Sequence, residues 1–157
     1  QAADPKTQLC DISNLLLQKW PAPEFSITTC LHLEQMKDGD VAGLVSLGGC
    51  YTALAVQKIH GKMSLQQRTG NWTKDDEVRT DLDEWNSDVI YMQMKVEKET
   101  YRTFYVGTTE ENLQPVGQMV EATPGRWVGV KDGLFVINEQ GAAGGSVAAD
   151  YFVYQSL

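Results

Sequence analysis

Alternation of apolar and polar residues with a period of two is the feature of this sequence that most restricts its fold. Along residues 25–33 the odd positions are apolar except Thr29, and the even positions are Ser, Thr, Cys and His. Side chains of a β-strand point alternately to its two faces, so this stretch predicts a half-buried strand of an antiparallel sheet. Its apolar side needs a second apolar layer, which favours folds with facing sheets.

Other short apolar runs follow, separated by turn residues. We expect strands at residues 25–33, 41–47, 50–58, 63–68, 89–97, 101–106, 127–130, 133–137 and 146–154. Turns are predicted at Asp-Gly 38–39, Gly-Gly 48–49 and His-Gly 60–61. The one helical candidate is residues 11–19, which Pro21 and Pro23 would end. This pattern predicts the all-β class and a two-sheet antiparallel β-sandwich or jelly roll.

Length and charge limit the classes of partner. The 157 residues fit one domain. A net charge of -8 disfavours nucleic acid, because an acidic surface repels phosphates, whereas neutral sugars remain allowed. No apolar run approaches the roughly 20 residues that a membrane helix needs. The N-terminus lacks the basic start and apolar stretch of a signal peptide, so we expect a removed signal or an excised piece of a longer chain.

Three cysteines, Cys10, Cys30 and Cys50, leave at least one thiol unpaired. Their spacing matches no zinc motif. We expect them to be small buried hydrophobes, with a Cys10–Cys30 or a Cys30–Cys50 disulfide as alternatives.

Candidate catalytic carboxylates occur as two alternating pairs, Glu97 with Glu99 and Asp81 with Asp83. A glycosidase needs two facing acids, one of them kept protonated by an apolar pocket. The first pair is expected in a charged turn, and the second in a polar loop over residues 69–87, so both are expected to be solvated. His32 on a polar strand face and His60 at a hairpin tip suggest no triad or metal pair. No catalytic residue is therefore predicted.

Ligand contact is predicted at the long polar loop and at oxygen-rich positions. Trp72, next to Asn71, is the best candidate for a ring that stacks on a sugar or contacts a partner, although it can also pack its loop onto the sheet. The calcium candidates, which form no complete ligand set in any one loop, are Asp38, Asp40 and Asp150.

Four segments together resemble one known family. They are NLLLQKWPAPEF at 14–25, GDVAGLV at 39–45, PGRWVGVKDGLF at 124–135 and GGSVAADYF at 144–152. This ordered set is similar to the C-terminal, concanavalin A-like β-sandwich of glycoside hydrolase family 43, the β-xylosidases and α-L-arabinofuranosidases. The resemblance implies a β-sandwich accessory domain over residues 14–157 and an N-terminal extension or linker over residues 1–13.

The resemblance also implies what the domain does. In such enzymes the chemistry belongs to a separate five-bladed propeller, against which the sandwich packs, and a loop of the sandwich can reach the wall of the substrate pocket. Here that loop is residues 121–126, with Thr123 and Arg126 as contact candidates. This loop lacks the aromatic residue that some relatives carry there. Two other segments also depart from the family pattern: Ala148 replaces the first acid of the DxDYF motif, and residues 104–117 differ from the usual hairpin.

Three hypotheses follow. The first is a non-catalytic accessory domain whose partner is the catalytic propeller, with an apolar docking patch for which Trp72 or Leu113 would be suited. The alternative is a free-standing carbohydrate-binding module for xylan- or arabinan-derived saccharides. The third, a catalytic jelly-roll glycosidase, lacks facing carboxylates. No cofactor other than calcium is expected, and a secreted or periplasmic parent is expected because such systems often act outside the cytoplasm.

Overall fold

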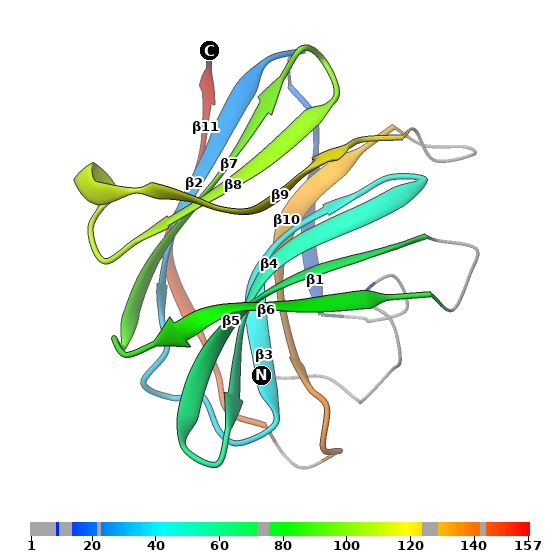
Figure 1. The fold of residues 1–157 in the computed structure, drawn as a ribbon. Helices are drawn as coiled ribbons and strands as arrows, with labels where there is room; N and C mark the ends of the chain where they lie inside the picture. The colour runs from blue at the N-terminus through cyan, green and yellow to red at the C-terminus, as the bar shows by residue number, and fades with distance from the viewer. Residues whose placement is uncertain (1–8, 10–13, 22, 72–75, 124–128, 142–143) are drawn as a thin grey trace.

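Two antiparallel sheets face one another in the computed structural model, which describes residues 9, 14–21, 23–71, 76–123, 129–141 and 144–157 (Figure 1). Within these residues the six-stranded sheet has the order β1 (Leu15–Lys19), β10 (Lys131–Asn138), β3 (Asp40–Leu47), β4 (Cys50–Ile59), β5 (Lys62–Asn71), β6 (Val78–Trp85). The five-stranded sheet has the order β11 (Ala148–Ser156), β2 (Phe25–His32), β7 (Val89–Glu97), β8 (Tyr101–Gly107), β9 (Gln114–Glu121). A 3₁₀ turn, η2 (Glu110–Asn112), joins β8 to β9. The predicted all-β sandwich is confirmed.

The main core lies between the sheets. Alternation in β2 directs Phe25, Ile27 and Leu31 into it, where they belong to one buried cluster with Leu44 of β3 and Leu54 of β4. The opposite side of β2 is less exposed than predicted, because β2 is a central strand between β11 and β7. Its outer side chains Ser26, Thr28 and Cys30 are also buried.

A second apolar cluster covers the outer face of the six-stranded sheet. Its members are Leu9, Val41, Val45, Leu47, Tyr51, Ala53, Ala55, Phe135 and Ile137, with Leu15 and Leu17 packed against them. Leu9 is almost fully buried although it lies within the predicted N-terminal extension. The boundary at residue 14 stays a prediction.

Three strands differ from the sequence prediction. Residues 15–19 form β1 and not a helix, since Leu15 and Leu17 pack on the second cluster while Leu16 between them is exposed, a period of two. Within the predicted polar loop, residues 78–85 form β6, whose charged side chains are exposed at the edge of the sheet. Residues 114–121 form the unpredicted edge strand β9. Of the predicted strand 127–130, only Gly129 and Val130 are described, and they belong to no strand.

The predicted hairpin tip at His60 is confirmed. His60 and Gly61 have φ of 50° and 75° between β4 and β5, the left-handed conformations of a tight hairpin. Cys30 and Cys50 are free thiols, so neither of the two alternative disulfides, both of which contain Cys30, is present. Cys10 lies outside the described residues. Among the described helical segments, none is long and apolar enough to cross a membrane.

Candidate functional site

Two of the predicted contact residues meet at one end of the sandwich. Asn71 ends β5 and is the register partner of Cys50, the first residue of β4. The Cys50 N–H donates to Thr123 Oγ1 at 2.8 Å, and the Gly49 N–H donates to the Thr123 carbonyl at 2.6 Å. Asn71 is held in turn by Asp76, whose Oδ2 accepts from Asn71 Nδ2 at 2.8 Å. Asn71 and Thr123 are therefore both neighbours of Cys50. Trp72 and Arg126, the other two candidates, lie outside the described residues.

A buried arginine supports this end of the molecule from inside. Arg102 of β8 donates to the Ser46 carbonyl at 3.2 Å, to the Glu121 carbonyl at 2.9 Å and to Cys50 Sγ at 3.2 Å. Burial opposes ionisation of Cys50, but the hydrogen bond with Thr123 and the charge of Arg102 outweigh it and lower the pKa of the thiol. The site thus offers a partly exposed thiol with a lowered pKa, beside polar backbone groups.

The acid pairs are not arranged as a glycosidase pair. Asp81 accepts from Gln66 on the outer face of β6, and Asp83 caps the Glu84 amide, both exposed on that edge strand. Glu97 and Glu99 are exposed at the β7–β8 turn, where Glu99 has φ of 67°. Glu99 shares a shallow hollow with Pro23, Glu24, Ser156 and Leu157. A general acid needs apolar surroundings, which none of these exposed carboxylates has.

The calcium candidates do not converge. Asp40 is fully buried, and its carboxylate accepts from the Lys37 amide, the Gly145 amide and Asn138 Nδ2 at 2.7 to 2.8 Å. Asp38 accepts from the Gly61 amide. Asp150 lies on β11 beside His32 instead. Calcium binding at these residues stays a prediction.

A cluster that the sequence analysis did not predict lies on the outer face of the five-stranded sheet. His32 Nε2 is 2.9 Å from Asp150 Oδ2, and the ligand-type atoms of Cys30, His32 and Asp150 all lie within 4.8 Å of one another. The hydrogen bond to Asp150 raises the pKa of His32 and lowers that of Asp150. The i, i+2 spacing of Cys30 and His32 could have suggested a shared face, but Asp150 is 118 residues away.

A buried polar cluster near Arg102 was also missed. Asp132 of β10 is fully buried, and among the described residues neither carboxylate oxygen has a hydrogen-bond partner within bonding geometry. Within the same part of the chain, Trp20 Nε1, Ser46 Oγ and Tyr154 OH also lack such a partner. Trp20, Ser46 and Arg102 are close enough to favour the charged form, yet burial dominates and raises the pKa of Asp132 to about 6.

An arginine network occupies the outer face of the six-stranded sheet. Arg68 is fully buried and its Nη1 lies 2.7 Å from Glu139 Oε1. Arg68 Nη1 also lies 3.6 Å from Glu77 Oε1, and Arg79 bridges the same two acids, 2.8 Å from Glu77 and 2.9 Å from Glu139. No local sequence pattern indicates this network, because Glu139 and Arg68 are far apart in the chain.

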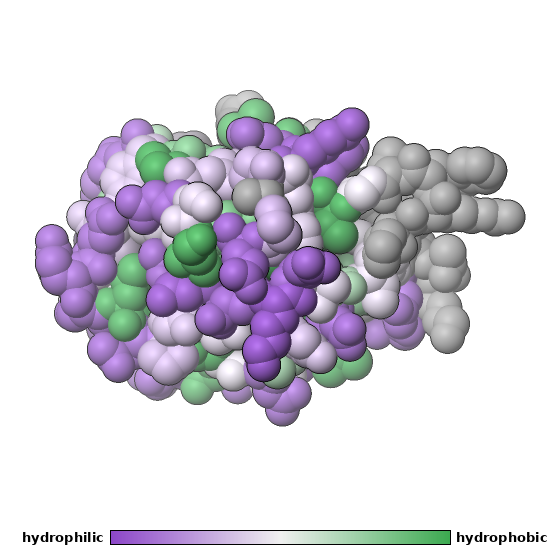
Figure 2. Space-filling view, turned by 90° about the horizontal axis from the view of Figure 1, so that it is seen from above, coloured by the Kyte–Doolittle hydropathy of each residue, from purple (hydrophilic) through white to green (hydrophobic). Residues whose placement is uncertain are grey.

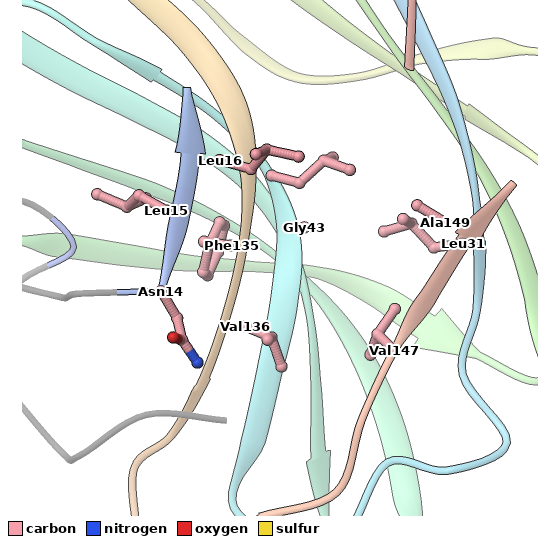
Figure 3. Close-up of a pocket in the computed structure, with 10 residues that line it drawn as sticks. Asn14, Leu15, Leu16, Leu31, Gly43, Phe135, Val136, Val147 and Ala149 are labelled. Atoms are coloured by element: carbon pink, nitrogen blue, oxygen red, sulfur yellow. The ribbon is translucent and has the colours of Figure 1, made fainter. Parts of the chain in front are cut away.

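An apolar pocket of about 350 Å³ opens at one edge of the sandwich (Figure 3). β1 and β10 flank it on one side, with β2 and β11 on the other, and Leu16, Leu31 and Val147 are among its lining residues. Leu16 is 73% exposed at its rim. On the face seen in Figure 2, by contrast, hydrophobic residues lie as separate small patches among hydrophilic ones.

Comparison with known proteins gives one family and a set of similar structures. The family model of the β-xylosidase C-terminal concanavalin A-like domain matches residues 2–155. A protein of Bacteroides eggerthii described as a bifunctional GH43-CE superposes with a TM-score of 0.85 at 21% identity, over 99% of this chain and 20% of its own. An engineered GH43 glycoside hydrolase with endo-xylanase and exo-arabinofuranosidase activity gives a TM-score of 0.86 at 17% identity, over 99% of this chain and 34% of that one.

A xylan β-1,4-xylosidase from Bacillus halodurans C-125 gives a TM-score of 0.77 at 20% identity, over 98% of this chain and 32% of that one. The chain thus spans a fifth to a third of these proteins. No curated protein matches it. Since the family model covers nearly all of its residues, the chain belongs to the family of β-xylosidase C-terminal concanavalin A-like domains.

Proposed function

We propose that this chain is a non-catalytic accessory domain of a family 43 glycoside hydrolase, a β-xylosidase or α-L-arabinofuranosidase of plant polysaccharide degradation. The observation that carries the proposal is the family match over residues 2–155. The similar structures support it, because this chain corresponds to 20% to 34% of each and leaves room for a catalytic propeller. The two candidate acid pairs, Asp81 with Asp83 and Glu97 with Glu99, are exposed and lack the apolar surroundings that a general acid needs, which supports the non-catalytic role.

The test of this role uses the purified chain and its parent enzyme. The chain alone should release no product from aryl β-xyloside or aryl α-arabinofuranoside, whereas the reading frame that contains it should encode a propeller whose activity survives or weakens when residues 1–157 are deleted. Turnover by the chain alone, retained after repurification, would refute the proposal.

The apolar pocket at the sandwich edge supports a docking face for the propeller. Leu16 is exposed there on an edge strand and extends the apolar lining of the pocket to the surface, where a partner can cover it. Leu113, the candidate predicted from the sequence, is only partly exposed, between η2 and β9. We expect Leu16→Asp to lower the Tm of the parent enzyme but not that of the isolated chain.

Val78→Asp is the matched control for Leu16→Asp. Val78 is 63% exposed on β6, at the opposite edge of the same sheet. It should leave both melting temperatures unchanged. Equal effects of the two variants on the parent enzyme would place the docking face elsewhere.

The segment at residues 121–126, which contains Thr123, is the part of the chain that we expect to contribute to the substrate pocket. A secreted or periplasmic location is expected because systems that degrade polysaccharides often act outside the cytoplasm. Saccharide binding by the chain alone is the alternative function. Calorimetry with xylo- and arabino-oligosaccharides at millimolar concentration should give no heat. Heat that Trp72→Ala abolishes would favour a carbohydrate-binding module instead.

A further inference from the structure

Three potential metal ligands converge on the outer face of the five-stranded sheet, next in the chain to Leu31 and Ala149 of the apolar pocket. Cys30 and His32 are two residues apart on β2, so their side chains point to the same face. Asp150 is the extra residue of a β-bulge, since Ala149 pairs with Leu31 and Tyr151 with Cys30. A bulge re-aims side chains, and here it brings the carboxylate to His32.

The arrangement is not that of a cysteine nucleophile. In a Cys-His-Asp triad the imidazole lies between the thiol and the acid, one ring nitrogen facing each. Here His32 Nε2 faces Asp150, and Nδ1 faces Glu34, 3.7 Å from its Oε1. Cys30 is only 1% exposed, too little for its sulfur to attack an organic substrate.

We propose that Cys30, His32 and Asp150 form a binding site for a thiophilic divalent cation of the Zn²⁺ class, with the remaining coordination position open to water. Sulfur, imidazole nitrogen and carboxylate oxygen are the ligands of zinc, whereas calcium takes oxygen ligands alone. Ligands around a tetrahedral zinc are about 3.5 Å apart. The three atoms, already within 4.8 Å, need only small side-chain rotations to reach that spacing.

The surroundings of the three residues suit a cation. Glu110 adds a further carboxylate on this face, where it accepts a hydrogen bond from the Tyr151 hydroxyl at 2.9 Å, and Tyr151 is the register partner of Cys30. Glu34 lies on the far side of the His32 ring, where metal-bound imidazoles commonly meet a carboxylate partner. A divalent ion would therefore neutralise a locally acidic surface.

Metal titration of the untagged, reduced and chelator-stripped 157-residue chain tests the site. Zn²⁺ should bind one per chain in competition with a chromophoric chelator, and Co²⁺ should give a thiolate charge-transfer band. Cys30→Ser should abolish that band, and His32→Asn and Asp150→Asn should each weaken Zn²⁺ binding at least tenfold.

Matched controls use the residues of the same type elsewhere in the chain. Cys50→Ser and His60→Asn should leave the Zn²⁺ affinity and the Co²⁺ band unchanged. Absence of stoichiometric binding, a band that survives Cys30→Ser, or a band lost in Cys50→Ser would each overturn the proposal. If Cys30→Ser fails to fold, His32→Asn, on a partly exposed ring, decides the outcome.

Discussion

At the scale of the residue, the interior of this sandwich contains charged side chains that the alternation of apolar and polar residues does not predict. Asp132 lies on β10 and faces Ser46 across the strand pair. The nearby Ser46, Trp20 and Arg102 favour its charged form, but no described group forms a hydrogen bond of good geometry with its carboxylate. An unpaired buried carboxylate is costly in its charged form. The cost appears as a raised pKa and therefore as a dependence of stability on pH.

Asp132→Asn should alter that dependence. The pKa of Asp132 rises from 3.8 to about 6 on folding, so between these values the folded chain holds a proton that the unfolded chain has lost. The contribution of Asp132 to stability is hence greatest below pH 3.8 and falls as pH rises to about 6. As the pH rises from 4 to 8, the free energy of unfolding of Asp132→Asn should therefore increase by about 2 kcal/mol relative to that of the natural chain.

Urea unfolding of both chains at pH 4, 6 and 8 measures this gain. Taking the difference between the two chains cancels the other carboxyl groups. If the free energies of unfolding of the two chains changed with pH in parallel, Asp132 would have the same pKa in the folded and unfolded states, which would contradict the prediction.

At the scale of the element, strands whose sequence alternates were predictable and strands whose sequence is polar were not. β2 and β7 have alternation that the core imposes, and both were predicted with bounds close to the observed ones. The polar sequence of β6 predicts a loop, because an edge strand needs no apolar face and can carry charges along its length. The sequence of β1 predicts a helix, because three consecutive leucines hide its period of two.

Close approach of two backbones makes β1 sensitive to a single methyl group. A Cβ at Gly133 of β10 would lie within van der Waals overlap of the Leu16 carbonyl on β1. Gly133→Ala should therefore push β1 away and destabilise the chain by about 2 kcal/mol. Hydrogen exchange should show faster exchange at residues 15–19 than in the natural chain.

Gly129→Ala is the control for this effect. A Cβ at Gly129 would meet no atom of the described residues within 4 Å. Its unfolding midpoint and the exchange of β1 should match those of the natural chain. Unchanged protection of residues 15–19 in Gly133→Ala would show that the strand pair absorbs the methyl group.

At the scale of the whole molecule, the fold and the family followed from the sequence, whereas the arrangement of the sites did not. Four ordered motifs identify the family without any contact being known. The clusters are different: Asp150 meets His32 across 118 residues of chain, and Arg102 meets Ser46 across 56. Such pairs depend on strand order and on a bulge, which no local pattern reveals. Asn71 and Thr123 were chosen for separate reasons and proved to be neighbours through Cys50.

Arg102 links the two sheets through polar contacts, so its removal should destabilise the packing of one sheet on the other. It stands on β8 of the five-stranded sheet and donates to Ser46 and Cys50 of the six-stranded sheet. Arg102→Met should destabilise the chain by about 3 kcal/mol, because it leaves buried acceptors and Asp132 without their cation. It should also raise the pKa of Cys50, since the Arg102 charge favours the thiolate.

Alkylation by iodoacetamide at pH 8, followed peptide by peptide, reads out the second effect. Cys50 should react several-fold more slowly in Arg102→Met, because thiolate is the reacting form. Cys30, whose pKa burial raises, should stay slow in both chains and report any general opening of the fold. In the double variant Arg102→Met/Asp132→Asn, part of the lost stability should return because no buried carboxylate remains unpaired, whereas the slow alkylation of Cys50 should persist. Recovery of both properties together would mean that Arg102 acts on Cys50 only by holding the fold closed.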